Sequence, residues 1–461
     1  MTLLLTLPSS RSTPLKWIAD IVLGEWLGLP FDLVEGAENA VVLERGGRRL
    51  VLASQFPDLA AVRSTWDAQL PMLPLAELDT REAWAEADLE GPLPVLSGLP
   101  RIEESENEIH CGIDMFGAIF LMLSRFEEVA LPDRDAHDRF PATASLAWKG
   151  GFLYRPVVDE YVVLLGAMIR RLWPDVAHPR REGRIRVSCD VDQPFDRVGR
   201  SAGALVRSLA GDLVRRRDPR LALRRVRNFV EHRRGDLRFD PYYTFDWYMD
   251  ACEAAGHSAA FYFIPDHSAG EIDGSYDLFE PRTLALIRAV GARAHEVGVH
   301  GSYNTYRDAG QIAHERQRMR DACAQAGVAQ AVCGNRQHYL RWDANETPDW
   351  LDAAGYDYDT TGCFADRPGF RYGTARSFPM WSWQRLSPLR LRQRPLILME
   401  GSVLADAYLG LGHSSAAMDL MQQLKSRALK HGGDFTLLWH NSYLLTKADR
   451  AFFQEIIRKD R

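Results

Sequence analysis

The second half of the chain alternates short apolar runs with longer stretches of helical periodicity. The apolar runs are rich in β-branched and aromatic residues, as in AAFYFIP (259–265) and FTLLWH (435–440). Short strands that alternate with helices are typical of βαβ units around a parallel sheet. Seven such runs occur, at 185–192, 259–265, 296–302, 331–340, 356–362, 395–401 and 435–440. We therefore expect an α/β fold, an irregular (β/α) barrel of about seven parallel strands.

The first part of the chain has a different pattern. The stretch AVVLERGGRRLVLA (40–53) places two apolar runs around a Gly-Gly pair, which predicts a β-hairpin. Strongly apolar helices are expected at 114–125 and 158–173, with a polar loop between them. The polar stretch HPRREG (178–183) has the composition of a linker.

These patterns predict two domains. A smaller α+β accessory domain would span residues 1–183, and the barrel would span residues 184–461. Within the barrel, a basic helical insertion covers residues 198–240, with twelve arginines between residues 200 and 238 and apolar residues at helical spacing. One interpretation is a solvated helix face, and the other is contact with an anionic glycan, a pyrophosphate-linked intermediate or a membrane surface.

Charge and cysteine usage exclude several classes of protein. The formal net charge of −6 gives the chain as a whole no electrostatic basis for holding nucleic acid. No segment has the roughly 18 uninterrupted apolar residues that a membrane span needs, and the opening segment lacks the basic start of an export signal. The six cysteines form no CxxC pair, so we expect reduced thiols and not a zinc finger. Together these features predict a cytoplasmic protein.

Side chains that can do chemistry follow several predicted strands at their carboxyl ends. Asp190 and Asp192 end the first run, and they project from the same side because side chains alternate along a strand. His300, Arg336 and His440 end later runs. The active site of a parallel β/α barrel lies at this face, so we expect the side chains to converge. Two nearby carboxylates suit a metal ligand and a general base, although an Asp-x-Asp pair also occurs as a turn or cap.

The order of these motifs resembles that of the polysaccharide deacetylase family, carbohydrate esterase family 4. Its first motif is a strand that ends in two aspartates, which implies that Asp190 is the catalytic base and Asp192 a metal ligand. Its second motif is a pair of metal-binding histidines four residues apart, and His300 matches the first of them. The resemblance covers residues 185–440 and implies the barrel fold of that family.

Two later motifs imply further catalytic roles. The sequence RQHY (336–339) resembles the family's Arg-x-Pro-Tyr motif. By that resemblance, Arg336 would orient the base, and the backbone N–H of Tyr339 would join an oxyanion hole. The sequence LWH (438–440) matches the family's Leu-x-His motif and implies that His440 is the general acid.

The chain departs from the family at the second metal-binding histidine, whose place is taken by Asn304. A neutral amide is a poorer zinc ligand than an imidazole, and His338, which replaces the family's proline, is the alternative. The resemblance therefore implies one divalent metal ion, preferably Zn²⁺, bound by Asp192, His300 and either Asn304 or His338. The family's Asp and Trp motif is met only loosely, by Asp359.

The N-terminal region resembles a domain of undefined function that accompanies divergent members of this family. Its acidic residues Glu127, Glu128 and Asp159 are interpreted as interdomain or helix-cap structure. Aromatic residues near the motifs could either stack on a sugar or belong to the core, which is the commoner case. They are Trp342, Phe364, Tyr372, Trp381 and Trp439.

The predicted function is that of a metal-dependent hydrolase that removes an acetyl group from a carbohydrate. The carbohydrate is expected to be an intermediate of bacterial surface-polysaccharide metabolism. Two alternatives remain. One is a catalytically degenerate glycan-binding or scaffolding protein on the same fold. The other is an amidohydrolase that acts on a non-sugar amide, because this fold hosts both activities.

Overall fold

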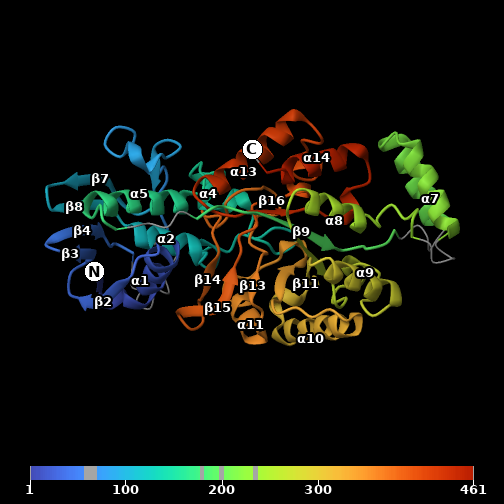
Figure 1. Ribbon diagram of the computed structural model, residues 1–461, viewed down its shortest axis with the longest axis horizontal. Helices are drawn as coiled ribbons and strands as arrows, with labels where there is room; N and C mark the ends of the chain where they lie inside the picture. Colours follow the sequence, from blue (N-terminus) through green and yellow to red (C-terminus); the bar gives the residue numbers. More distant parts are fainter. Residues whose placement is uncertain (1, 57–69, 177–180, 197–201, 232–236, 460–461) are drawn as a thin grey trace.

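A computed structural model of the chain describes residues 2–56, 70–176, 181–196, 202–231 and 237–459 (Figure 1). The C-terminal part is built on one nine-stranded sheet, and the N-terminal part contains a six-stranded and a two-stranded sheet. Figure 1 shows the two parts next to each other along the longest axis of the molecule. The architecture is therefore mixed α/β.

Each of the seven apolar runs contains a strand of the nine-stranded sheet. The strands are β9 (Ile185–Val191), β10 (Ala259–Phe263), β11 (Glu296–Gly301), β12 (Gly334–Gln337), β13 (Tyr358–Asp359), β16 (Leu398–Met399) and β17 (Phe435–Leu438). They pair in parallel in the order β13-β12-β11-β10-β9-β17-β16. The predicted parallel arrangement of these runs is confirmed.

The sequence analysis missed a hairpin at one edge of this sheet. The strands β14 (Phe378–Ser382) and β15 (Ser387–Gln393) are antiparallel to each other, and β15 pairs in parallel with β13. Apolar and charged positions alternate along β15, SPLRLRQ, which is the pattern of a half-buried strand. A search for continuous apolar runs does not detect such a strand.

Within the described residues no strand pairing closes this sheet, so the predicted irregular (β/α) barrel is not confirmed, and the strand pairing is that of an open, curled sheet. Six strands lie between β15 and β16, yet only residues 394–397 link the two. Such a linker spans at most about 18 Å, whereas a flat sheet would hold these strands about 33 Å apart. The linker also bridges the two edges, because Arg394 N–H donates to the Asp359 carbonyl (2.8 Å) and Ile397 N–H to the Thr436 carbonyl (3.1 Å).

Helices surround the curled sheet and share a hydrophobic core with it (Figure 1). Phe261, Leu351 and Phe453 are completely buried in this core. Burying a side chain of this size contributes roughly 1.5–3 kcal/mol. The helices are α8 (Phe245–Ala254), α9 (Pro281–Ala292), α10 (Ala309–Ala326), α11 (Thr347–Ala354), α12 (Glu400–Leu404), α13 (Ser415–Lys430) and α14 (Lys447–Ile457).

The N-terminal part contains the predicted hairpin and both predicted apolar helices. The hairpin strands are β3 (Ala40–Arg45) and β4 (Arg48–Ala53), and both turn glycines have a positive φ. The helices are α2 (Met115–Leu123), capped by the Asp114 carboxylate, and α5 (Val157–Leu172). The other strands are β1 (Leu3–Pro8), β2 (Phe31–Gly36), β5 (Ala76–Leu78), β6 (Leu93–Val95), β7 (Gly98–Glu104) and β8 (Glu108–Ile113), and the other helices are α1 (Ser12–Ala19), α3 (Phe126–Ala130) and α4 (Leu146–Lys149).

Buried charges join the two parts of the molecule. Glu128 accepts hydrogen bonds from Arg371 Nη2 (2.6 Å) and from Arg125 Nε (2.8 Å), and all three side chains are at most 3 % exposed. Asp159 accepts from Thr374 Oγ1 (2.6 Å). The structural interpretation of Glu127, Glu128 and Asp159 is confirmed. The N-terminal hydrophobic core also contains side chains from residues 364–383. The domain boundary at residue 183 therefore stays a prediction.

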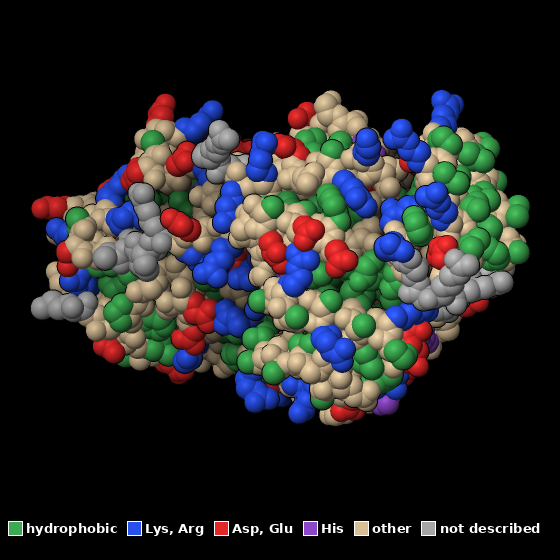
Figure 2. Space-filling view, turned by 45° about the vertical axis from the view of Figure 1, so that its right-hand side comes forward, with side chains coloured by type: hydrophobic (Ala, Val, Ile, Leu, Met, Phe, Trp, Pro, Cys, Tyr) green, Lys and Arg blue, Asp and Glu red, His purple; other side chains and the backbone are tan. Residues whose placement is uncertain are grey.

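The basic insertion forms helices α6 (Ala202–Ala210) and α7 (Pro219–Glu231), while residues 198–201 and 232–236 of the predicted range lie outside the described residues. Arg225 faces inward and pairs with Asp212 (2.6 Å), and its side chain is only 3 % exposed. Apolar side chains of the insertion face outward instead. They are Val206, Leu213, Val214, Leu223, Val226 and Val230, and Figure 2 shows hydrophobic side chains gathered on this end of the molecule.

The described helices include none with the length and apolar character needed to cross a bilayer. All six cysteines are free thiols, and five of them are buried, as expected. Burial raises the pKa of the Cys111 and Cys363 thiols to about 12.

Candidate metal centre

Three side chains from different strand ends form a cluster suited to a metal ion. Asp192 follows β9, His300 belongs to β11, and His338 follows β12. One ligand atom from each lies within 4.8 Å of the other two. Asp192 Oδ1 is 3.2 Å from His300 Nε2 and 3.7 Å from His338 Nε2. The parallel strands β9, β10, β11 and β12 are neighbours, so their carboxyl ends meet at one edge of the sheet.

The two histidines of this cluster are held by their other ring nitrogen. His300 Nδ1 lies 2.8 Å from the Arg336 carbonyl oxygen, and His338 Nδ1 lies 2.9 Å from Asp273 Oδ1. Both acceptors take a proton from Nδ1, so Nε2 is the ring atom that each neutral imidazole would offer to a metal ion. Metal-binding histidines are held by carbonyls or carboxylates in this way, so the contacts fit two metal ligands.

Asp192 completes the donor set with an unsatisfied oxygen. Its Oδ1 is buried and makes no well-directed hydrogen bond within the described residues, although two imidazole nitrogens face it. Withdrawal from water would raise the pKa of Asp192, but His338, His300 and His440 outweigh this effect and hold the pKa well below its usual range. One carboxylate and two imidazoles are a donor set that zinc prefers, so these residues fit a divalent metal ion.

Asn304, the other candidate for a metal ligand, is engaged elsewhere. It is exposed, its Nδ2 donates to the Ser268 carbonyl (3.1 Å), and its Oδ1 accepts from Arg341 Nη1 (3.2 Å). His338 lies in the cluster with Asp192 and His300, whereas both amide atoms of Asn304 are occupied by hydrogen bonds outside it.

The predicted base Asp190 is paired with the predicted orienting residue. Arg336 is completely buried and donates from Nη1 to Asp190 Oδ1 (3.0 Å) and to Ser188 Oγ (2.9 Å). Its Nε and Nη2 donate to the backbone and the hydroxyl of Thr360 (both 3.1 Å). The second oxygen of Asp190 lies 3.7 Å from His300 Nε2 and so faces the metal-ligand cluster.

The predicted acid His440 lies on the other side of Asp192. Its Nε2 is 3.8 Å from Asp192 Oδ2, and its Nδ1 is 2.5 Å from Glu400 Oε1. Burial would lower the pKa of His440, but the carboxylates of Glu400, Asp192 and Asp190 outweigh it and raise the pKa to about 10. The raised pKa favours the protonated imidazole that a general acid needs.

A segment of the N-terminal part reaches the candidate site at Tyr339. Tyr339 has a left-handed backbone (φ 61°, ψ 11°), and its carbonyl accepts from Arg139 Nη1 (3.0 Å). His137 Nδ1 lies 3.0 Å from the Tyr303 hydroxyl, and Arg341 Nε donates to the His137 carbonyl (2.8 Å). No described residue accepts a hydrogen bond from the Tyr339 N–H.

The aromatic residues considered for sugar stacking are buried, each at most 4 % exposed, and belong to the core. They are Trp342, Phe364, Tyr372, Trp381 and Trp439. Tyr339 (39 % exposed) and Tyr443 (45 %) offer rings to solvent instead. The Tyr339 ring lies 4.8 Å from that of His338, and the Tyr443 ring 5.8 Å from that of His440. Asp359, the loose match to the fourth motif, is buried and bonds with Asn335 and Thr361.

Sequence reasoning missed Asp273 and Glu400, which hold His338 and His440. Glu400 lies within the apolar run 395–401 and directly follows β16, so its position at a strand end was a usable signal. Asp273 ends a 3-10 helix, Gly270–Asp273, and is completely buried. No strand or motif precedes it, so the sequence carries no comparable signal for this residue.

Residues 3–174 match a family of unknown function, DUF7033. No curated protein matches the chain. Among solved structures, one described as a "putative polysaccharide deacetylase" from Mycobacterium smegmatis is similar, with 17 % sequence identity and a TM-score of 0.37. The match covers 62 % of this chain and 84 % of that chain. A likeness of this degree assigns neither fold nor function to this chain, so the site has to be judged by its own side chains.

Proposed function

We propose that the protein is a metal-dependent hydrolase that removes an acetyl group from a carbohydrate. The observation that carries this proposal is the cluster of Asp192, His300 and His338, with an unsatisfied carboxylate oxygen facing two imidazole Nε2 atoms. These three residues would hold the ion, and Asn304 would not. A divalent ion bound there would polarise the acetyl carbonyl and lower the pKa of a water molecule.

Asp190 is suited to be the general base. Arg336 occupies its Oδ1 at 3.0 Å and fixes the carboxylate, which leaves Oδ2 on the side of the metal ligands. That oxygen would take the proton of the attacking water. A positioned base of this kind contributes roughly 10²–10⁴-fold to the rate.

His440 is suited to be the general acid. Glu400 keeps its imidazole protonated and turns Nε2 toward Asp192. His440 would give its proton to the leaving amine or alkoxide of the sugar. The negative charge that develops on the acetyl oxygen would be met in part by the N–H of Tyr339. Arg139 donates to the Tyr339 carbonyl and so helps to hold the left-handed backbone of this residue.

A carbohydrate suits the rim of this site. Tyr339 and Tyr443 present exposed rings next to His338 and His440, and tyrosines combine an apolar face with a polar hydroxyl. We take the substrate to be an intermediate of bacterial surface-polysaccharide metabolism, in agreement with the family that the motifs resemble.

The test is mass spectrometry of acetylated monosaccharides, oligosaccharides, and nucleotide- and lipid-linked sugars after incubation with zinc-loaded protein. We expect one substrate to lose a single acetyl mass, with no loss in the Asp190→Asn variant. Acetate released only from non-sugar amides would support the amidohydrolase alternative. Binding of sugars with no release from any compound would support the glycan-binding alternative, and either result would overturn the proposal.

We also propose that the basic insertion contacts an anionic membrane surface. In α7, Leu223, Val226 and Val230 are exposed while Arg225 is turned inward, so an apolar stripe faces outward on a basic helix. This arrangement suits a helix that lies in a lipid interface. Sedimentation with vesicles of phosphatidylglycerol and of phosphatidylcholine tests it. We expect the protein to sediment with the phosphatidylglycerol vesicles only, and the Leu223→Ser/Val226→Ser variant to lose this binding. Equal sedimentation of the variant and the unchanged protein would contradict the proposal.

A further inference from the structure

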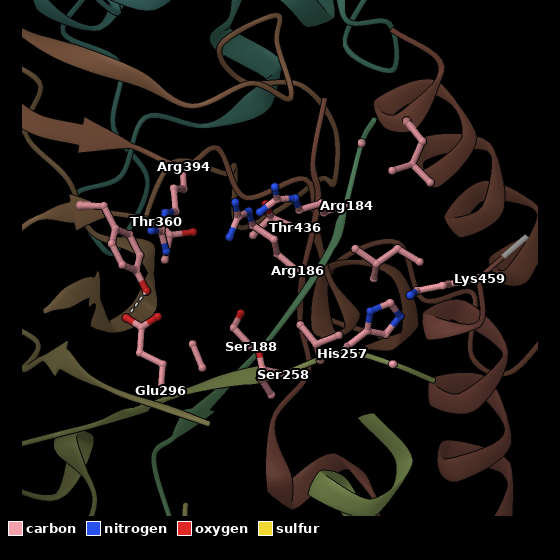
Figure 3. Close-up of a pocket in the computed structure, with 18 of the residues that line it drawn as sticks. Arg184, Arg186, Ser188, His257, Ser258, Glu296, Thr360, Arg394, Thr436 and Lys459 are labelled. Carbon is pink, nitrogen blue, oxygen red and sulfur yellow. Dashed lines mark hydrogen bonds between the residues drawn. The ribbon is translucent and has the colours of Figure 1, made fainter. Parts of the chain in front are cut away.

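A second cavity lies at the opposite end of the curled sheet from the candidate metal centre. Its volume is about 760 Å³, and it is lined by residues at the amino ends of β9, β10, β11 and β17. Figure 3 shows the guanidinium groups of Arg184, Arg186 and Arg394 on one part of its wall, and Lys459 and His257 on another. None of these residues has a part in the proposed hydrolase chemistry.

The strand β9 connects this cavity with the candidate active site. Side chains alternate along a strand, so Arg184, Arg186, Ser188 and Asp190 project from the same face. Arg184, Arg186 and Ser188 line the cavity, whereas Asp190 belongs to the metal-centre side. Arg336 also lines the cavity, and its contacts with Ser188 and Asp190 separate the two spaces.

The wall of the cavity carries more positive than negative charge. Arg181 and Arg186 share one carboxylate, that of Asp434, at 2.7 and 2.5 Å. Glu296 accepts from the Tyr358 hydroxyl (2.6 Å), and Glu182 is exposed at the rim. These two glutamates are the acidic lining residues. The cationic lining residues are Arg181, Arg184, Arg186, Arg336, Arg394 and Lys459.

Three of the cations have no carboxylate partner among the described residues: Arg184, Arg394 and Lys459. Arg394 instead lies over the ring of Tyr358, 3.4 Å from its centroid, a contact that orients its planar group. Thr436 and Ser258 add hydroxyl donors to the same wall. Arg184 and Lys459 are exposed and Arg394 is half-buried, so the attraction for an anion comes from several cations that face one hollow together.

We propose that this cavity binds a phosphate-bearing anion. Guanidinium groups match the paired oxygens of a phosphate, and two or three of them on one wall suit a group with more than one negative charge. The volume exceeds that of one phosphate and accommodates a pyrophosphate with an organic substituent. The ligand class is therefore phosphate or pyrophosphate compounds, bound at the end of the sheet opposite the metal centre.

The test is isothermal titration of the full chain with inorganic pyrophosphate. We expect saturable binding that weakens as salt is added, because the contacts are electrostatic. The double variant Arg184→Gln/Arg394→Gln should weaken binding at least about tenfold, the effect of losing one charge-assisted hydrogen bond. The matched control is Arg320→Gln, which removes an exposed arginine of α10 outside the cavity and should leave binding unchanged.

Two further titrations decide whether the anion lies in this cavity. Pyrophosphate also coordinates metal ions, so the Asp192→Asn variant is titrated in parallel and should bind it as the unchanged protein does. Loss of binding in Asp192→Asn would place the anion at the metal centre and overturn the proposal. Absence of binding to the unchanged protein, or equal binding by the double variant with an unaltered circular dichroism spectrum, would also overturn it. If the double variant is misfolded, the single change Lys459→Gln, at an exposed side chain, replaces it under the same criteria.

Discussion

One oxygen of Glu400, Oε1, accepts both the Nδ1–H (2.5 Å) and the backbone N–H (3.1 Å) of His440. The carboxylate is completely buried, so its charge acts on the imidazole with little screening by water. This double contact fixes the direction of the His440 ring and stabilises its protonated form. It makes Glu400 a positioning residue for the proposed acid.

Replacing Glu400 by glutamine should therefore change the pH dependence of the reaction. A general acid must carry its proton, so activity falls as pH rises through the pKa of His440. Glu400 raises that pKa, and a neutral amide would let it fall, which moves the alkaline limb of the kcat profile to lower pH by about one to three pH units. If the alkaline limb of the kcat–pH profile stays at the same pH in Glu400→Gln, Glu400 does not act through His440.

The two aspartates of β9 should have separable roles. Asp190→Asn removes the proposed base and should lower kcat by about 10²–10⁴-fold while the metal stays bound. Asp192→Asn removes a charged ligand and should reduce zinc affinity by more than about tenfold. Metal content and acetate release, measured on both variants, check the assignment. Equal metal loss in the two variants would mean that their roles are exchanged.

The third metal ligand can be located with a pair of variants. His338→Ala should weaken zinc binding strongly, whereas Asn304→Ala should leave it unchanged, because the Asn304 amide bonds with Ser268 and Arg341. Asp273→Asn removes the carboxylate that orients His338 and should cost about 10–100-fold in zinc affinity. Competition titrations with a zinc chelator measure all three. A large loss of zinc affinity in Asn304→Ala, with no loss in His338→Ala, would mean that Asn304 and not His338 is the third ligand.

The N-terminal segment should contribute to turnover through the backbone of Tyr339. Arg139→Gln removes the hydrogen bond to the Tyr339 carbonyl and should lower kcat roughly tenfold, since the N–H on that residue is then less well placed. Zinc content should stay the same. Arg101→Gln, an exposed arginine of β7, is the matched control. Unchanged kcat in Arg139→Gln would exclude this contribution.

The sequence indicated the candidate site residues that lie at the carboxyl ends of strands. Asp190, Asp192, His300 and Arg336 were identifiable because strand periodicity places them at a common edge, and all four meet there. The sequence could not decide whether Asn304 or His338 is the third metal ligand. The answer depends on the direction in which the turn that holds each residue points its side chain. The structure directs His338 inward and Asn304 to the surface.

Contacts between distant segments were outside the reach of the sequence pattern. Arg139 and Tyr339 are 200 residues apart in the sequence and form a hydrogen bond, and no local motif indicates this contact. The parallel strands of the fold were predicted from the sequence, but the open strand pairing of the sheet was not. The strand β15 alternates leucine with arginine, so it resembles a surface strand, and its insertion beside β13 leaves the sheet open in its strand pairing.

The central claim is that one divalent ion binds between Asp192, His300 and His338. Anomalous diffraction at the zinc absorption edge, from crystals of protein purified without chelator and supplied with zinc, tests it most directly. The account predicts a single strong peak about 2.0–2.2 Å from one Asp192 oxygen and from both histidine Nε2 atoms. A peak at another site, or none there after saturation with zinc, would contradict it.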